Sequence, residues 1–346
     1  MLAPLDGRLS CAYGENAAQA PAALLVTDLD DPLALGSFTQ VEGAALSYNN
    51  LAELDRQLQT ITHMAAAYDR PGAAAGAGAA PALALGTKHG NACGAAAAAT
   101  PADAIRRMLE GDLRAIFGGC VMLGFSVGAE EAELLLSHAV EGGRRLLDLV
   151  TAASFSDEAV ELLARKHGKC RLLANPALGA LDRSSLDAAP RTRPVRGGVL
   201  EQPNYTFVLD LDAPEVEATA PLSDAQRHDL LLAWAVGATS NSNTITLVRD
   251  GALIGNGVGQ QDRVSCCALA ITRATDAGHA IAGAVAYSDS FFPFPDAPQT
   301  LIDAGIAAVF STSGSVRDDL VRQAFRDAGV PLAQLPDRAA RGFYAH

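Results

Sequence analysis

Predicted strands and helices alternate through the second half of this chain of 346 residues. β-branched residues flank Asp250-Gly251, a pair that favours the tight turn of a β-hairpin, so residues 243–259 are predicted to form two antiparallel strands. A helix is predicted over 262–278, and a strand, a helix, a strand and a helix follow up to residue 329. This order is typical of α/β folds, in which helices cover the faces of a sheet.

The first half has a similar rhythm, after a stretch to about residue 48 that is predicted to form strands and loops. Residues 83–96 predict a buried strand, a glycine-rich turn and then a helix, and residues 114–127 predict a strand broken by Gly118 and Gly119. Residues 69–81 predict a mobile surface loop. Further helices are predicted over 49–68 with Asn50 as N-cap, 101–110 with Pro101 near its start, 129–140, 157–167 and 224–239. We expect two subdomains, residues 1–195 and 196–346.

Composition and charge exclude several classes of protein. Hydrophobic residues make up 49% and charged residues 19% of the chain, a balance typical of a folded globular protein. The formal net charge of −13 disfavours nucleic acid as a partner. No apolar run reaches about 18 residues, so no membrane span is expected, and the N-terminus lacks the pattern of a secretory signal. We expect a cytoplasmic protein with six reduced cysteines and, because no Cys or His spacing fits a zinc site, no metal.

Lys88 and His89 are the first candidates for chemistry. They follow a predicted buried strand, at a turn opened by Gly90 and Gly94, and Lys88 is the sole lysine among the first 165 residues. Titratable side chains displayed at the end of a strand are typical of functional sites. A solvated lysine beside a capping histidine explains the same pattern equally well.

Three motifs in the second half concern ligand binding. Gly255-Asn256-Gly257-Val258-Gly259 lacks the GxGxxG spacing of a dinucleotide site, and we interpret its glycines as letting the backbone approach a ligand, with Arg263 one turn into the next helix. Phe291-Phe292-Pro293-Phe294 is either core or the wall of a pocket for a flat ring. Thr312-Ser313-Gly314-Ser315 either holds an anion on its backbone N–H groups or caps the following helix.

Short segments in a fixed order extend over nearly the whole chain. They are Tyr13-Gly14-Glu15-Asn16, Ser47-Tyr48-Asn49-Asn50-Leu51, Lys88-His89-x-Asn91-x-Cys93-Gly94, Phe117-Gly118-Gly119, Arg196-Gly197-Gly198, Ser242-Asn243, Ile254-Gly255-x-Gly257-x-Gly259-Gln260-Gln261-x-Arg263, Ser288-Asp289-x-Phe291-Phe292-Pro293-Phe294, Gly314-Ser315 and Arg341-x-Phe343. In this order they resemble the formyltransferase portion of the bifunctional purine enzymes, AICAR transformylase/IMP cyclohydrolase. The chain starts almost at the first segment, so we expect no cyclohydrolase domain.

The resemblance implies an architecture and a set of ligands. The fold would be two cytidine-deaminase-like α/β subdomains without zinc, in a homodimer with active sites at the subunit interface. The co-substrate would be 10-formyltetrahydrofolate, and the acceptor would be the amine of AICAR, an aminoimidazole carboxamide ribotide.

The resemblance also implies roles for individual residues. The catalytic positions fall on Lys88, His89 and Asn243. The positions that bind the acceptor substrate fall on Tyr13, Gly14, Gly118, Glu141, Arg263, Phe291 and Arg341. The folate-binding positions fall on Val264, Asp296, Ser315 and Val316.

The residue types suit formyl transfer. The acceptor amine is a poor nucleophile because its lone pair is conjugated with the ring, so a base with a pKa near neutrality has to take its proton, as histidine can. Attack on the formyl carbon creates an oxyanion that Lys88 and the Asn243 amide can stabilise, by about 3 kcal/mol per well-placed donor. Phe291 can pack on a flat ring, and Arg263 and Arg341 supply cations for anionic ligands.

Some positions depart from the family pattern. The family's Arg-Tyr-Gly, whose arginine binds the acceptor phosphate, is Ala12-Tyr13-Gly14 here, and Arg8 is a candidate replacement. Ala17-Ala18, Ala92 and Pro295 also replace family residues. We therefore expect weaker recognition of phosphate, with AICAR as the default acceptor. Two alternatives stay open: a formyltransferase of specialised metabolism acting on an unphosphorylated aminoazole or aminopyrrole amine, and a catalytically silent homologue that binds a ligand.

Overall fold

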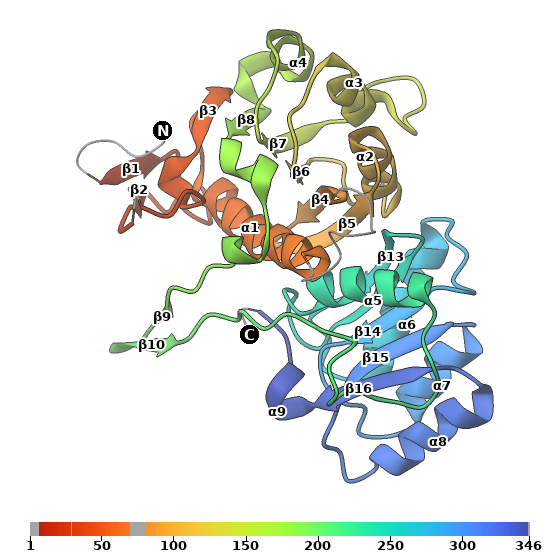
Figure 1. Ribbon diagram of the computed structural model, residues 1–346. Helices are drawn as coiled ribbons and strands as arrows, with labels where there is room; N and C mark the ends of the chain where they lie inside the picture. Colours follow the sequence, from red (N-terminus) through yellow and green to blue (C-terminus); the bar gives the residue numbers. More distant parts are fainter. Residues whose placement is uncertain (1–6, 29, 70–79, 345–346) are drawn as a thin grey trace.

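The computed structural model describes residues 7–28, 30–69 and 80–344 (Figure 1). The strands of its main sheet are β3 (Thr39–Glu42), β4 (Ala82–Lys88), β5 (Asn91–Ala98), β6 (Gly119–Leu123), β7 (Leu147–Ala152), β8 (Arg171–Ala174), β11 (Glu217–Ala218), β12 (Ile245–Arg249), β13 (Ala252–Gly257), β14 (Val285–Ser288), β15 (Ala308–Ser313) and β16 (Leu332–Pro336). The α-helices are α1 (Tyr48–Tyr68), α2 (Pro101–Glu110), α3 (Ala129–Ser137), α4 (Asp157–Leu163), α5 (Asp224–Gly237), α6 (Arg263–Asp276), α7 (Asp296–Asp303), α8 (Asp318–Ala328) and α9 (Asp337–Ala340).

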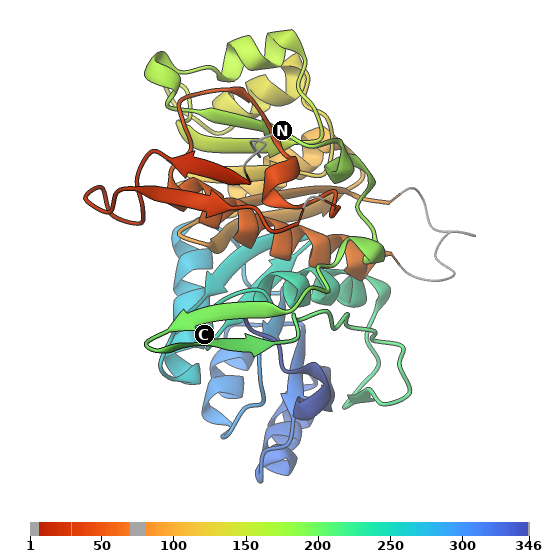
Figure 2. The ribbon, with the colours of Figure 1, turned by 90° about the vertical axis from the view of Figure 1, so that its left-hand side faces the viewer.

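Shorter elements lie outside the main sheet. β1 (Arg8–Cys11) pairs with β2 (Ala22–Leu25), and β9 (Arg191–Val195) pairs with β10 (Gly198–Gln202). Short 3₁₀ helices lie at Leu35–Ser37, Lys166–Gly168, Pro176–Ala180 and Arg183–Ser185. Figure 1 shows the β9–β10 hairpin extending from the body of the molecule as a two-stranded arm, and in Figure 2, seen from that side, the arm lies in front of the body. The subdomain boundary expected near residue 195 falls at the turn of this hairpin and stays a prediction.

The main sheet consists of two halves with the same order of elements. In the first half, a helix (α1) precedes an antiparallel hairpin (β4–β5), and three helix–strand units follow, up to β8. The second half repeats this order from α5 through β12–β13 to β16. In both halves the last three strands are parallel to one another. The α/β class is confirmed, and the two like halves agree with the fold that the resemblance implies.

The two halves join through their hairpins to form one sheet of 12 strands, in the order β11-β16-β15-β14-β12-β13-β5-β4-β6-β7-β8-β3. At the centre, β13 pairs antiparallel with β5, with Ala252 opposite Ala96. An antiparallel pair between equivalent strands relates the two halves by a local twofold axis. Any feature of one hairpin therefore has a counterpart in the other that can be compared with it.

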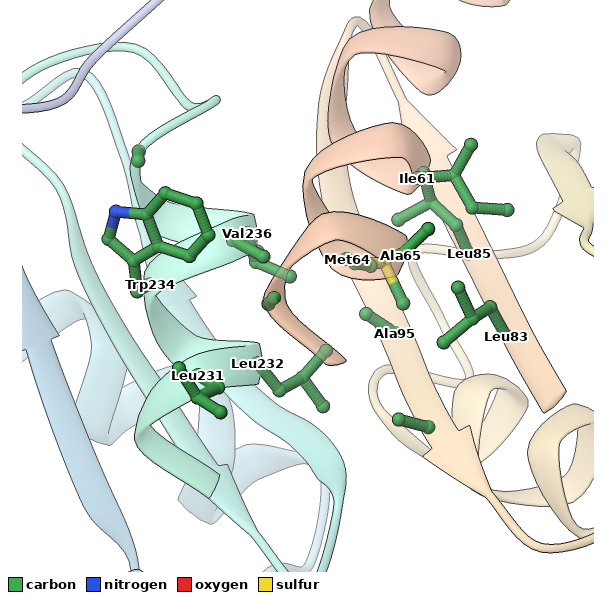
Figure 3. Close-up of a cluster of buried hydrophobic side chains, with 14 of the residues drawn as sticks. Ile61, Met64, Ala65, Leu83, Leu85, Ala95, Leu231, Leu232, Trp234 and Val236 are labelled. Atoms are coloured by element: carbon green, nitrogen blue, oxygen red, sulfur yellow. The ribbon is translucent and has the colours of Figure 1, made fainter. Parts of the chain in front are cut away.

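Helices cover both faces of the sheet. α1 and α5 pack together on one face, and their buried side chains form one core with those of the central strands. Figure 3 shows Ile61 and Met64 of α1 between Leu85 of β4 on one side and Leu232 of α5 on the other. On the opposite face, α2–α4 and α6–α8 cover two separate cores. No helix in the described part of the chain is both long and apolar enough to cross a membrane.

Two predicted elements differ in the structure. Of the strand predicted over residues 114–127, only Gly119–Leu123 forms β6, and the residues directly before it form a turn. The helix expected after the glycine-rich turn is strand β5, although its sequence is mostly alanine, the strongest helix former. A Cβ on Gly94 would lie 1.9 Å from the Met108 carbonyl oxygen, so α2 packs against the backbone of this strand. Ala95 and Ala96 are fully buried. Small side chains let helices approach both faces of the strand, and this packing overrides the helix propensity of alanine.

Several helix ends also differ from prediction. α1 begins at Tyr48 because Ser47 is its N-cap, and Asn50 instead completes a capping box, accepting from the Ser47 N–H at 2.9 Å. α3 and α4 end at Ser137 and Leu163, before the predicted ends at residues 140 and 167. The helix from Pro101 to Glu110 is confirmed. The predicted loop at 69–81 lies mostly outside the described residues. All six cysteines are free thiols, as expected.

His63 is buried in α1 at the contact between the helices. Its ring stacks on Tyr205 with centroids 5.5 Å apart and lies 5.7 Å from Trp234. Its Nδ1 donates to the Gln59 carbonyl at 2.7 Å. Burial lowers the pKa of His63 from 6.5 to about 4, so the ring is neutral at pH 7.

Because His63 is buried and neutral, we predict that acid lowers the stability of the fold. Below pH 6.5 the unfolded chain protonates His63 while the folded protein does not, so the free energy of unfolding falls as the pH drops towards 4. The expected loss is roughly 3 kcal/mol. Urea unfolding of wild type and His63→Gln between pH 7 and pH 4 measures it. The variant should have a flatter pH dependence, and equal slopes would contradict the assignment to His63.

Candidate functional site

Lys88 and His89 lie at the turn between β4 and β5, as predicted for the end of a buried strand. His89 and Gly90 both adopt positive φ, at 54° and 73°, so the turn is tight and displays the His89 side chain on the surface. The Lys88 Nζ donates to the carbonyl of Phe117 at 2.6 Å. This bond ties the turn to the loop that carries Gly118.

Two side chains of α1 hold this turn in place. The Glu53 carboxylate accepts from the Gly90 N–H at 2.7 Å and from the Thr87 hydroxyl at 2.9 Å. The Arg56 Nε donates to the Gly90 carbonyl at 3.0 Å. The N–H and the carbonyl of Gly90 are therefore both bound by side chains of the same helix, three residues apart on one face.

A pocket of about 480 Å³ opens beside the turn. Four of the predicted site residues line it, namely Tyr13, Lys88, His89 and Gly118. The backbone of Tyr13 accepts from the Tyr48 N–H at 3.0 Å, and the Asn49 amide donates to the Glu15 carbonyl at 3.0 Å. The segments YGEN and SYNN, far apart in the sequence, thus build one wall together. Gly14 is buried in that wall, where a Cβ would lie 2.9 Å from Gln19.

The pocket is also lined by four charged residues and one polar residue that the sequence analysis did not single out. They are Glu53, Arg56, Asp148 and Arg171, and the polar Asn241. Glu53 and Arg56 follow the SYNN motif at a spacing that shares a helix face, a signal that was present in the sequence. Asp148 and Arg171 lie at the starts of the parallel strands β7 and β8, and nothing in their local sequence marks them. Glu141 lies in the exposed loop after α3 and does not line the pocket.

A second group of predicted residues surrounds a buried ion pair. Arg263 lies 2.5 Å from Asp289, and its side chain also donates to Asn243 Oδ1 and Ser288 Oγ, each at 2.8 Å. Asn243 Nδ2 donates to the Gln260 carbonyl at 2.8 Å. The Asn243 amide is therefore oriented by two partners.

Arg263 is the first residue of α6, whereas the sequence predicted a position one turn into this helix. The interpretation of Gly255 and Gly257 is also wrong. A Cβ on either would lie 2.4 Å from a backbone oxygen of α6, so these glycines let the helix pack closely on β13. Gly259, with a φ of 67°, has open space around it.

The remaining predicted residues lie near the ends of β14 and β15. Arg341 pairs with Asp337, whose Oδ1 accepts from Ser290 and Thr312. Phe291 is half-buried and Phe292 is buried, so this aromatic motif belongs partly to the core. Phe294 is 44% exposed, with the Arg317 guanidinium 4.4 Å from its ring centroid.

The proposed folate positions are largely exposed. Val264 and Val316 expose their side chains, and Asp296 is the first residue of α7. The backbone N–H groups of Gly314 and Ser315 donate to Asp318, at 2.6 and 3.2 Å. They bind a carboxylate of the next helix, which favours the capping interpretation of this motif. The described residues contain no group of three or more His, Cys, Asp or Glu side chains that could hold a metal ion.

The two ion pairs predict different losses of stability. Asp289→Ala leaves Arg263, whose side chain is 10% exposed, without its counterion, and should lower the free energy of unfolding by about 3–5 kcal/mol. Arg341→Ala removes a side chain that is 48% exposed and should cost about 1 kcal/mol or less. Urea unfolding of both variants measures this difference. Equal losses would show that the Arg263–Asp289 pair is not the stronger constraint.

The comparisons with known proteins agree on one family. A family model described as "AICARFT/IMPCHase bienzyme" matches residues 4–273. Three proteins named bifunctional purine biosynthesis protein PurH are similar to this chain. They are 38% identical in Cutibacterium acnes, 32% in Anoxybacillus flavithermus and 33% in Roseobacter denitrificans, over 92–93% of this chain. The chain spans only 56–57% of their length. With a matching family model over most of its residues, the chain belongs to the AICARFT/IMPCHase bienzyme family.

Proposed function

We propose that this chain is a formyltransferase that moves a formyl group from 10-formyltetrahydrofolate to the amine of AICAR or a closely related aminoazole carboxamide. The observation that carries the proposal is the Lys88–His89 turn beside a pocket of about 480 Å³, in a chain of this family. A pocket of this size suits a small ligand. The cationic and anionic side chains that line it suit a polar one.

His89 is the base in this mechanism. The acceptor amine attacks the formyl carbon and loses a proton to the His89 imidazole as the new C–N bond forms. The carbonyl oxygen becomes an oxyanion. When the tetrahedral adduct collapses, the bond between the formyl carbon and N10 of the folate breaks, and the protonated His89 returns the proton to N10. Atoms and charge balance without a metal.

Lys88 and Asn243 are the groups proposed to stabilise the oxyanion. Lys88 is fixed by the Phe117 carbonyl, and an ammonium has two more hydrogens to donate. The Asn243 carboxamide is oriented by Arg263 and Gln260, and its nitrogen retains a second hydrogen. Preoriented donors stabilise a developing charge because they do not have to reorganise during the reaction.

The site is proposed to be completed by a second copy of the chain, in a cytoplasmic homodimer. Asn243, Arg263, Phe291 and Arg341 do not line the described pocket that contains His89. Their position outside the lining of that pocket supports an active site shared between subunits. The β9–β10 arm exposes Val195, Val199 and Leu200, at 43%, 62% and 60%, which suits a protein contact.

The proposed base gives the first functional prediction. His89→Ala should lower kcat about 10²–10⁴-fold, because the amine then loses its proton without a positioned acceptor. A formyl-transfer assay with AICAR and 10-formyltetrahydrofolate measures this, and circular dichroism checks that the variant is folded. A folded variant with near wild-type turnover would refute the role of His89.

Recognition of the acceptor phosphate gives the second functional prediction. Ala12 is exposed next to Tyr13, and the family's phosphate-binding arginine is absent there, so wild type should distinguish AICAR only weakly from its nucleoside. Ala12→Arg should raise kcat/KM for AICAR about tenfold or more, since a charge-assisted hydrogen bond contributes roughly 1.5–3 kcal/mol.

Arg171 provides a test of the opposite outcome, in which wild type already recognises the phosphate strongly. Arg8 does not line the described pocket, whereas Arg171 does. A strong wild-type preference for AICAR that Ala12→Arg leaves unchanged and Arg171→Met abolishes would assign the phosphate to Arg171 and contradict the expectation of weak recognition.

A further inference from the structure

The turn that carries His89 has a structural copy in the second half of the molecule. His89 and Gly90 have φ of 54° and 73°, and Asp250 and Gly251, at the turn between β12 and β13, have φ of 53° and 72°. The local twofold axis relates these two hairpins. The second turn lacks a histidine, so it shows which features belong to the fold and which belong to the site.

The carboxylate that holds the turn occurs in both halves. Glu53 is the sixth residue of α1, and Asp229 is the sixth residue of α5. Glu53 accepts from the Gly90 N–H at 2.7 Å, and Asp229 accepts from the Gly251 N–H, also at 2.7 Å. A carboxylate at the sixth position of the helix therefore stabilises the hairpin in either half, whether the turn carries His89 or Asp250.

Arg56 is the feature that the two halves do not share. It is the ninth residue of α1, and the ninth residue of α5 is Leu232. The Gly90 carbonyl accepts from Arg56 Nε at 3.0 Å, whereas the Gly251 carbonyl accepts from the backbone N–H of Ala97. The arginine is not needed to form a turn of this kind, and it is present at the turn with the histidine.

The same guanidinium reaches the loop that precedes Asn243. Arg56 Nη2 donates to the Thr239 carbonyl at 3.1 Å and to Asn241 Oδ1 at 3.3 Å, and Nη1 donates to the Tyr344 carbonyl at 3.3 Å. Its charge also lies 4.6 Å from the Tyr344 ring centroid. A planar guanidinium with fixed donor directions holds its partners at set distances and angles.

We propose that Arg56 is a positioning residue that fixes the Lys88–His89 turn to the Thr239–Asn241 loop of the same chain. All three of its nitrogens donate to groups of the protein, so it acts through those groups. The proposal rests on the proposed function, in which His89 is the base. Displacing such a base by about 1 Å can slow a reaction about a hundredfold.

The kinetic test compares two arginines that stack on the same ring. Arg191 lies 4.5 Å from the Tyr344 ring centroid and pairs with Asp55, and it has no role in the proposed reaction. Arg56→Met should lower kcat about 10–100-fold with KM changed less than about threefold, while Arg191→Met retains wild-type kcat. Sedimentation checks that the oligomeric state is equal. Equal kcat values in the two variants would overturn the proposal.

A second measurement needs no activity. The imidazole signals of His89, assigned by their loss in His89→Gln, are followed by NMR over pH 5–9 in wild type and both Met variants. Arg56→Met should shift these signals or their apparent pKa, and Arg191→Met should not. His89 signals that are identical in wild type and Arg56→Met overturn the positioning role, whatever the kinetics show.

The two measurements separate the two claims. Wild-type protein that transfers no formyl group refutes the proposed function, while the NMR comparison still decides whether Arg56 positions His89. If Arg56→Met does not fold, Arg56→Lys provides the same comparison, because it retains the charge but loses the planar set of donors. The kcat of Arg56→Lys is expected to lie between that of wild type and a value 10–100-fold lower.

Discussion

The pairing of β5 with β13 is the contact on which the rest of the molecule depends. It joins two half-sheets into one and fixes the side on which α1 and α5 meet. The contact is made by small residues, with Ala96 opposite Ala252 and the Gly251 carbonyl accepting from the Ala97 N–H at 3.0 Å. Larger side chains would keep the flanking helices further from these strands. The run of alanines is therefore part of the architecture.

Buried charges hold the proposed functional groups on this frame. Arg263 is held by Asp289 and orients Asn243, while Arg56 connects the Gly90 turn to Asn241. Burial lowers the pKa of Arg56, so these bonds must compensate for the loss of water around the charge. Buried ion pairs contribute little net stability, but their geometry is tightly constrained, because an unsatisfied charge in the interior is costly. Side chains bonded to such a pair are therefore held in fixed positions, as groups that act on a reacting atom require.

Local patterns in the sequence were sufficient for part of this structure. The Asp250-Gly251 turn and the amphipathic helices depend on neighbouring residues, so they could be predicted. Strand β5 could not be predicted, because alanine favours a helix unless tertiary packing overrides this propensity. The position of Lys88 and His89 at a strand end could also be predicted, from the glycines that follow them. The contacts of Arg56 could not be predicted, because its partners lie 34, 183, 185 and 288 residues away in the sequence.

The two ends of the main sheet have a consequence for how the protein behaves in a crowded solution. A wide sheet with long free edges invites strands of other molecules to add to it. Here one outermost strand, β11, has two residues, and the other, β3, has four with an irregular register between Gln40 and Glu42. Pro194 interrupts the donors along β9 of the projecting arm. Growth of the sheet by addition of strands from other molecules is therefore disfavoured.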